Sequence, residues 1–251
     1  MPEPQERPPI AQAPLSVVLL AQPGEAGLDE VVRDWVAYLD SLGREYEVLV
    51  VDAGGADRLL EAAEPPAVPS SGVRALHPSM PTGVGAALRT GLAATRFPLF
   101  FYADGTRAYQ PRDLALLLDV IDHVDLVSGY RVGPKRRYRE TWKEWLFRWL
   151  VRVVFGVHLR DMDCSFKLFR KTIFTRIPVQ SDGPFAHAEI LAKANFLGCL
   201  ITEVAVSYDP DRLARAAPAD LRQKWSQSWR VFRHPDFGPA ALPQETPGPP
   251  A

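Results

Sequence analysis

Two short apolar stretches end in aspartate, and these carboxylates have the clearest chemical potential in the sequence. Asp104 follows Phe97–Ala103 and precedes a glycine, while Asp52 follows Tyr46–Val51. An apolar run of this length between turn signals predicts a strand that is buried on both faces. Ligands of open α/β sheets bind just beyond the carboxyl ends of the strands, so Asp104 could meet a metal or a phosphate-bearing ligand there. An aspartate that only caps the following turn is the alternative.

Glycines and basic residues elsewhere in the chain are further candidates. The segment Gly83–Ala94 begins with two glycines and continues with small residues, which predicts a helix whose first N–H groups can approach an anionic ligand closely. Close packing of small residues against the sheet is the alternative. Arg131 ends another predicted strand, and Lys167 follows two carboxylates in the segment Asp161–Arg170. Charged side chains of both signs therefore lie next to apolar segments of the chain.

Alternating strands and helices must position these side chains. Residues 15–21 and 46–52 are predicted strands, and apolar residues at helical spacing predict a helix over residues 28–42 between them. This strand–helix–strand order is the parallel βαβ unit. The remaining predicted strands lie at residues 73–77, 97–104, 125–131 and 200–208, and the remaining predicted helices at residues 83–94, at residues 111–122 and before Gly198. The predicted fold class is therefore α/β, a Rossmann-like, mostly parallel sheet flanked by helices.

The composition is that of an ordinary globular protein. The 251 residues include 47% apolar and 24% charged residues with a formal net charge of -1, so no overall basic field points to nucleic acid. The two cysteines, Cys164 and Cys199, cannot form a disulfide framework, and a reducing compartment is expected. The first residues lack the apolar core of a signal peptide, and no apolar run is long enough to span a bilayer. Membrane contact is therefore expected only at the surface or through a partner.

A tryptophan-rich segment could provide such a contact. Trp142, Trp145 and Trp149 recur at helical spacing with apolar residues up to Val154, next to a basic cluster. A stripe of this kind beside lysines and arginines is typical of a helix that lies in a lipid interface. A helix that packs its stripe on its own domain is the alternative. The interface helix is expected at about residues 140–155.

The two ends of the chain differ from the rest in composition. Residues 1–14 are rich in proline and are expected to form a disordered tail, as are residues 234–251. Residues 209–233 form a basic extension in which Trp225 and Trp229 have helical spacing. A single folded domain is therefore expected over residues 15–208.

Four blocks of sequence, taken in order, resemble the family 2 glycosyltransferases of the GT-A fold, closest to the polyprenyl-phosphate (dolichyl-phosphate) mannosyl- and glucosyltransferases. The blocks are Ser128–Arg131, the segment Leu150–Gly156 with the following Asp161–Arg170, Ser181–Glu189, and Glu203–Val206. The resemblance covers roughly residues 15–208. Four blocks at family spacing are far more specific than any lone motif.

The resemblance implies the ligands of such an enzyme. It implies a nucleotide-sugar donor, a divalent cation (Mg²⁺ or Mn²⁺) that bridges the diphosphate to a DxD motif, and a polyprenyl phosphate or other lipid-linked acceptor. The reaction is displacement at the anomeric carbon, with the metal and cationic side chains stabilising charge on the leaving diphosphate. The expected location is cytoplasmic, at the inner face of the membrane, and no nucleic-acid partner is expected.

The residues that the resemblance nominates fall into three sets. The catalytic set is Asp104, Arg131, Lys167, Asp163 and Glu189. The nucleotide-binding set is Ala21, Asp52, Gly83, Arg89 and Asp104, and the metal-binding set is Asp104 and Thr106. Arg131 and Lys167 are expected to hold phosphate groups, the arginine with bidentate geometry.

The donor side departs from the family pattern. The DxD motif here is Asp104-Gly-Thr106, so one of two metal-binding anions is replaced by a hydroxyl, which hard cations bind less tightly. Ala53 replaces the carboxylate that usually accompanies Asp52, and Gly24 replaces a glutamate after the first strand. A catalytically impaired GT-A scaffold that acts as a binding or regulatory protein is therefore the alternative to a working transferase. Another nucleotide-using α/β enzyme, such as a nucleotidyltransferase, is a third possibility.

Overall fold

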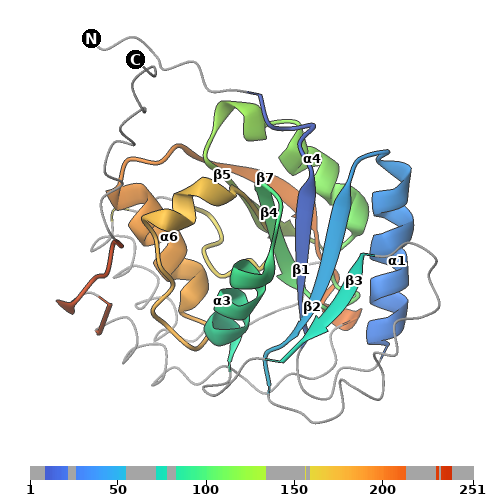
Figure 1. Ribbon diagram of the computed structural model, residues 1–251, viewed down its shortest axis with the longest axis horizontal. Coiled ribbons are helices and arrows are strands. Elements are labelled where there is room, and N and C mark those ends of the chain that lie inside the picture. The colour runs from blue at the N-terminus through green and yellow to red at the C-terminus, as the bar shows by residue number, and fades with distance from the viewer. Residues whose placement is uncertain are drawn as a thin grey trace, which may run out of the picture.

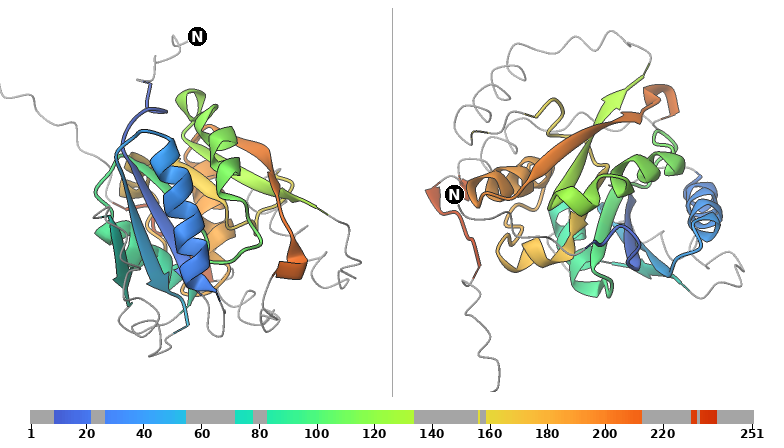
Figure 2. Two further views of the ribbon diagram at one scale, coloured as in Figure 1. Left: turned by 90° about the vertical axis from the view of Figure 1, so that its right-hand side faces the viewer. Right: turned by 90° about the horizontal axis from the view of Figure 1, so that it is seen from above.

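The protein is built on one sheet with helices on both faces (Figure 1, Figure 2). The computed structural model describes residues 9–21, 27–54, 72–77, 83–133, 156, 159–212, 230–231 and 233–238. The strands are β1 (Leu15–Ala21), β2 (Tyr46–Asp52), β3 (Val73–Leu76), β4 (Leu99–Asp104), β5 (Leu126–Val132), β6 (Lys167–Arg170) and β7 (Ile201–Ser207). The helices are α1 (Leu28–Ser41), α3 (Val84–Ala94), α4 (Leu114–Leu118) and α6 (Ala186–Phe196), and short 3-10 turns lie at Pro111–Asp113, Ile121–His123, Lys171–Thr175 and Pro210–Arg212.

The strand order is β3-β2-β1-β4-β6-β5-β7. Strands β1 to β4 are parallel to their neighbours in this group, and β7 is parallel to β5. Strand β6 runs antiparallel to both β4 and β5, between which it lies. The βαβ unit predicted at the start of the chain is present, because β1 and β2 are adjacent and parallel with α1 between them in sequence. The predicted α/β class with a mostly parallel sheet is confirmed.

The central strands are buried on both faces, as their unbroken apolar runs predicted. Every residue of β1 is buried, and so is every residue of β4 before its terminal aspartate. On one face, Trp35 of α1 packs on Phe101 and Phe166, with ring centroids 5.2 and 6.1 Å away. Helices α3 and α6 lie on the other face (Figure 1). Their buried residues belong to the same apolar cluster as Phe100 and Tyr102. Burial of this apolar surface on both faces is the main source of stability.

Small residues allow α3 to lie close to the sheet. A Cβ atom added at Gly91 would lie 2.8 Å from Cγ1 of Val18 and 3.4 Å from Cγ2 of Val51. A carbon–carbon separation of 2.8 Å is shorter than packed side chains tolerate, so only glycine permits this approach. At Gly91 the small residue therefore allows close packing on the sheet, which was the alternative to a role in anion binding.

Replacing Gly91 by alanine is expected to destabilise the protein, although alanine is the better helix former. Overpacking against Val18 costs about 1–3 kcal/mol, which outweighs a gain in helix propensity of about 1 kcal/mol. Urea unfolding should give a lower free energy of unfolding for Gly91→Ala than for the wild type. Ala93→Gly, on the exposed side of the same helix, is the matched control and should lose about 1 kcal/mol. The packing argument is wrong if Gly91→Ala stabilises the protein by the amount that Ala93→Gly destabilises it.

Residues 9–14, expected in a disordered tail, are held against the domain. The Asp122 carboxylate accepts hydrogen bonds from the backbone N–H groups of Ile10 and Ala11, at 2.5 and 2.8 Å. The expectation of disorder was therefore wrong for this part of the tail. Disorder was predicted from the proline content of the segment. The carboxylate of Asp122, far away in the sequence, satisfies two of its backbone N–H groups, and composition cannot reveal such a contact.

Several expectations from the sequence fall on residues outside the described ranges. These are the interface helix at about 140–155 with Trp142, Trp145 and Trp149, most of the extension 209–233, and the tails at 1–8 and 239–251. They stay predictions. Among the helices that the structure describes, none has the length and apolar character needed to cross a membrane.

Candidate functional site

Candidate site residues from several strands meet at the carboxyl edge of the sheet. Ala21 pairs with Asp52 at the ends of β1 and β2, and Asp104 ends the neighbouring strand β4. Because β6 is antiparallel, it begins at this edge with Lys167, and β5 reaches the same edge near Arg131. The positions that the rule for α/β sheets indicated thus lie along one edge of the sheet.

The carboxylate of Asp104 faces other protein groups at the end of β4. The Ser165 hydroxyl donates a hydrogen bond to it, and the charges of Arg131 and Lys167 act on it. Burial raises the pKa of Asp104 above its ordinary value, while the hydrogen bond and the two cations act against this rise. Asp104 is therefore half-buried, in the field of two positive charges.

Arg131 is held in one orientation by a bidentate ion pair. Its Nε and Nη2 atoms donate to the two carboxylate oxygens of Asp161 at 2.6 and 2.8 Å. The guanidinium carbon lies 5.2 Å from the centroid of the Tyr208 ring. Burial would lower the pKa of Arg131, but Asp161 raises it overall, so the guanidinium stays charged. With 34% of its side chain exposed, Arg131 is oriented and yet accessible to a ligand.

Glu203 of β7 positions the partner of this arginine. Its carboxylate accepts hydrogen bonds from the backbone N–H groups of Arg160, at 2.9 Å to each oxygen, and of Asp161, at 3.3 Å. The Asp161 carboxylate is therefore fixed through its own backbone. Burial would raise the pKa of Asp161, but Arg131 lowers it overall, which keeps the pair ionised.

Lys167 is fully buried beneath this edge. Its Nζ donates to the carbonyl oxygens of Cys164 and Met162, the second at 3.3 Å. Burial lowers the pKa of Lys167, while nearby negative groups, among them Asp161 and Asp163, act in the opposite direction. A ligand cannot touch this ammonium group directly, so Lys167 acts on the site through its charge.

Asp52 caps the turn that follows β2. One carboxylate oxygen accepts a hydrogen bond from the backbone N–H of Gly54 at 2.8 Å, and the other lies 3.9 Å from Nδ1 of His77. The N–H of Ala53 donates to the carbonyl oxygen of Ala21 at 2.9 Å, which joins the ends of β1 and β2. The turn-capping alternative is thus observed for Asp52, and its contact with a nucleotide stays a prediction.

The donor set at Asp104 does not fit the metal that the resemblance implies. The hydroxyl of Thr106 accepts a hydrogen bond from the N–H of Ala108 at 3.2 Å, and only 4% of Thr106 is exposed. Within the ranges that the structure describes, no group of three or more His, Cys, Asp or Glu side chains is placed to hold a metal ion. Mg²⁺ and Mn²⁺ favour several oxygen ligands, so a single carboxylate beside two cations is a poor site.

The first turn of α3 is closed by the chain itself. The carbonyl oxygen of Asp182 accepts hydrogen bonds from the N–H groups of Gly85 at 2.7 Å and Ala86 at 3.3 Å. A Cβ atom at Gly83 would lie 2.4 Å from that same oxygen, and one at Gly85 would lie 1.8 Å from the carbonyl oxygen of Ser181. The glycines therefore admit a neighbouring segment of the protein, and these N–H groups are not open to an anion.

Arg89 of α3 binds the same neighbouring segment, residues 179–182. Its Nη1 donates to the carbonyl oxygens of Val179 and Ser181 at 3.3 and 3.1 Å, and its Nη2 pairs with the carboxylate of Asp182. The guanidinium thus fastens this segment to α3. The nucleotide-binding role nominated for Arg89 stays a prediction that these contacts do not favour.

Glu189 is fully buried and bonded within the protein, and the catalytic role nominated for it stays a prediction. Its oxygens accept hydrogen bonds from the backbone N–H groups of Gln180 and Ser181 at 2.7 and 2.8 Å, and the Nζ of Lys193 lies 2.7 Å away. Lys193 also donates to the carbonyl oxygen of Pro178 at 2.6 Å. None of the surface of Glu189 is exposed, so these partners account for its position without a ligand.

Three polar residues that the sequence analysis did not nominate complete the cluster around Arg131. The hydroxyl of Tyr109 lies 3.3 Å from that of Ser165 and 3.6 Å from the sulfur of Cys164. Tyr208 supplies the ring beneath the guanidinium, and its centroid is 5.0 Å from that of Tyr109. A tyrosine or serine near a strand end carries no sequence signal that separates a site residue from a core residue.

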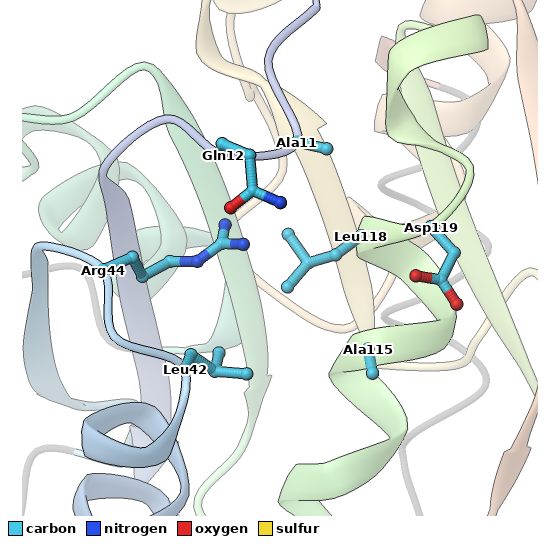
Figure 3. Close-up of a pocket in the computed structure, with 7 residues that line it drawn as sticks. All are labelled: Ala11, Gln12, Leu42, Arg44, Ala115, Leu118 and Asp119. Atoms are coloured by element: carbon cyan, nitrogen blue, oxygen red, sulfur yellow. The ribbon is translucent and has the colours of Figure 1, made fainter.

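The pocket in Figure 3 lies at the opposite, amino edge of the sheet. Its volume is about 340 Å³, and it is lined by Ala11, Gln12, Leu42, Arg44, Ala115, Leu118 and Asp119. The Nε and Nη1 atoms of Arg44 are buried without a hydrogen-bond partner, and burial lowers the pKa of Arg44. None of the nominated site residues lines this pocket, so it is separate from the candidate site.

Comparisons with known proteins point to the same family as the sequence blocks. A family model described as "Glycosyl transferase family 2" matches residues 16–178. Glycosyltransferase AglD of Haloferax volcanii is 29% identical over 224 residues, which cover 84% of this chain and 36% of that protein. Dodecaprenyl-phosphate galacturonate synthase of Rhizobium johnstonii is 24% identical over 178 residues, 69% of this chain and 53% of that protein. Dolichyl-phosphate beta-glucosyltransferase of Dictyostelium discoideum is 25% identical over 221 residues, 80% of this chain and 68% of that protein.

This chain thus spans about a third of the first of these relatives and about half of the second. Among solved structures, glucosyl-3-phosphoglycerate synthase from Mycobacterium tuberculosis in complex with Mn²⁺, UDP and phosphoglyceric acid matches with a TM-score of 0.67 at 22% identity, covering 92% of this chain and 81% of that chain. The same enzyme with Mn²⁺, UDP-glucose and phosphoglyceric acid matches with a TM-score of 0.68 at 23% identity, covering 90% and 82%. At this identity the likeness shows the fold alone, which is the GT-A architecture.

Proposed function

The chain belongs to glycosyltransferase family 2, and from this premise we propose that it transfers a sugar from a nucleotide-sugar donor to an acceptor. The observation that carries the proposal is that Asp52, Asp104 and Arg131 lie along one edge of the sheet, at the carboxyl ends of β2, β4 and β5. Ligands of open α/β folds bind at that edge, and a negatively charged ligand would find there an accessible and oriented guanidinium.

The proposed acceptor is a polyprenyl phosphate or another lipid-linked group at a membrane surface. The names of two relatives contain dodecaprenyl phosphate and dolichyl phosphate, which supports this class of acceptor. The segment Trp142–Val154, whose tryptophans and basic neighbours suit a lipid interface, is the proposed point of contact with the membrane, at its cytoplasmic face.

Transfer to a phosphate acceptor depends on cations more than on a base. An acceptor phosphate oxygen forms a bond to the anomeric carbon, the bond from that carbon to the donor diphosphate breaks, and the nucleoside diphosphate leaves with the electron pair. Because the acceptor is already an anion, no proton has to be removed. Arg131, oriented by Asp161, is proposed to hold phosphate, and Lys167 contributes a buried positive charge.

The described residues hold no fitting place for a divalent cation. A bound Mg²⁺ or Mn²⁺ would stabilise charge on the leaving diphosphate, and the two solved structures named above contain Mn²⁺. The proposed ligands, Asp104 and Thr106, do not form a fitting donor set in this chain. No step of the proposed reaction therefore uses a metal.

A binding or regulatory scaffold remains the second candidate function. The observation that favours it is that Thr106, Arg89 and Glu189, nominated for metal binding, nucleotide binding and catalysis, each bond to other groups of the protein. Such a protein would keep the sheet and its carboxyl edge and lack turnover.

A ligand screen followed by a transfer assay tests the proposal. UDP, GDP and their sugars should raise the melting temperature, because a ligand at about 100 times its Kd stabilises the folded state by about 2.7 kcal/mol. The same sugars should then appear on polyprenyl phosphate in vesicles. The transferase proposal fails if no nucleotide or nucleotide sugar shifts the melting temperature at millimolar concentration. Binding without transfer would favour the scaffold, and release of pyrophosphate from a nucleoside triphosphate with a sugar phosphate would indicate a nucleotidyltransferase.

A further inference from the structure

The pocket in Figure 3 is built by three segments that lie apart in the sequence. Residues 11–12 precede β1, residues 42–44 follow α1, and residues 115–119 belong to α4 and its C-terminal end. The carboxylate of Asp122 holds the first of these segments through two backbone N–H groups. The walls of the pocket are therefore parts of the chain that other contacts already hold in place.

Arg44 brings hydrogen-bond donors into this pocket that the protein does not satisfy. Its Nε and Nη1 atoms are buried and have no hydrogen-bond partner among the described residues. The guanidinium points into the space between Gln12 and Leu118 (Figure 3). Arginine stays charged in proteins, and buried donors of a charged group are costly to leave without an acceptor. An acceptor that a ligand brings into the pocket would remove this cost.

The other lining groups favour a ligand with one negative charge and an apolar body. Leu42, Ala115 and Leu118 contribute apolar side chains to the walls. The carboxylate of Asp119 is exposed at the same pocket and would repel a second negative charge on a ligand. The volume of about 340 Å³ lies in the range of small-molecule pockets, which is roughly 300–1,000 Å³.

We propose that this pocket binds a small organic monocarboxylate, whose carboxylate accepts hydrogen bonds from the guanidinium of Arg44. The apolar part of the ligand packs on Leu42 and Leu118, and the side-chain amide of Gln12 supplies a further donor. The inference goes beyond sugar transfer and does not rest on it, because none of the nominated site residues lines the pocket.

Thermal unfolding of the full chain with benzoate as the probe tests this inference, with sodium chloride at equal ionic strength as the baseline. Benzoate at about 10 mM should raise the melting temperature by about 3–6 °C, as expected for a Kd of about 1 mM. Acetate should give a smaller shift because it lacks the apolar body. Benzamide, which has a similar shape without the charge, should give none.

Three results of this screen would overturn the inference. If neither carboxylate shifts the melting temperature, solvent alone satisfies the donors of Arg44. If benzamide acts as strongly as benzoate, the pocket does not recognise charge. If inorganic phosphate gives a larger shift than benzoate, the ligand is not a monocarboxylate.

Substitutions locate the binding and test its charge dependence. Arg44→Gln should abolish the benzoate shift, whereas Arg33→Gln, the same change at an exposed arginine of α1, is the matched control and should keep it. Asp119→Asn removes a negative charge from the pocket and should tighten benzoate binding about threefold. A shift that persists in folded Arg44→Gln, or weaker binding in Asp119→Asn, would contradict the proposed site.

A further variant decides if Arg44→Gln does not fold. Ala115→Leu fills the apolar part of the pocket with a larger side chain and leaves Arg44 in place. Its affinity for benzoate should fall at least about tenfold, because the ligand loses the space for its ring. Unchanged affinity in this variant would show that benzoate binds elsewhere.

Discussion

Replacing Glu189 by alanine should lower the free energy of unfolding by about 3–5 kcal/mol. The carboxylate is fully buried, and its removal leaves the ammonium of Lys193 buried without its charge partner. The N–H groups of Gln180 and Ser181 would lose their acceptors as well. Urea unfolding followed by far-UV circular dichroism measures the loss.

An exposed ion pair supplies the control for this prediction. Glu30 pairs with Arg107, and both side chains are about half exposed, so Glu30→Ala should cost no more than about 1 kcal/mol. The double variant Glu189→Gln with Lys193→Met leaves no unpaired buried charge and should be more stable than Glu189→Ala. If Glu189→Ala instead keeps wild-type stability and loses sugar transfer, the catalytic role nominated for Glu189 is right and the structural role is wrong.

Replacing Arg131 by lysine should lower kcat/KM for sugar transfer about 10²–10³-fold, because a lysine cannot reproduce an oriented fork of donors. The bidentate pair with Asp161 would be lost, and the remaining ammonium would be free to rotate away from the phosphate. The melting temperature should change little, because the side chain is partly exposed and lies near the end of β5. Initial rates at varied acceptor concentration measure the effect.

Arg160→Lys is the matched control for this substitution. Its guanidinium carbon lies 4.7 Å from the centroid of the Tyr130 ring, and the residue is exposed beside the same edge. The kcat/KM of Arg160→Lys should stay within about threefold of the wild-type value, as expected for an exposed cation. Equal losses in Arg131→Lys and Arg160→Lys would show that overall positive charge, and not the oriented guanidinium, supports transfer.

The fold was largely predictable because its signals are local. The apolar runs that became β1, β2 and β4 need no partner to be recognised, and the helical spacing of α1 is visible within its own residues. The antiparallel direction of β6 was not predicted. Its four residues include two buried cations, Lys167 and Arg170, whose compensation by carbonyl oxygens only the folded chain reveals.

The edge of the sheet on which the candidate residues lie was predictable, whereas their contacts within the protein were not. The strand-end rule placed Asp52, Asp104 and Arg131 at one edge, because it depends only on where each strand stops. The partners of Arg89 and Glu189 come from the segment 178–182, which no local pattern connects with α3. The sequence identifies the carboxylate of Glu189, whereas only the structure shows that backbone N–H groups already donate hydrogen bonds to it.

The N-terminal N–H groups of helix α3 are capped by Asp182, a residue that is synthesised long after the helix itself. The carbonyl oxygen of Asp182 accepts the leading amides of α3, and Arg89 secures the same segment. A nascent chain that has not reached this segment therefore carries a helix with a frayed start, even when β1, β2 and β4 are already available to pair. The start of α3 is therefore complete only after the later segment has docked, although the body of the helix contacts β1 and β2.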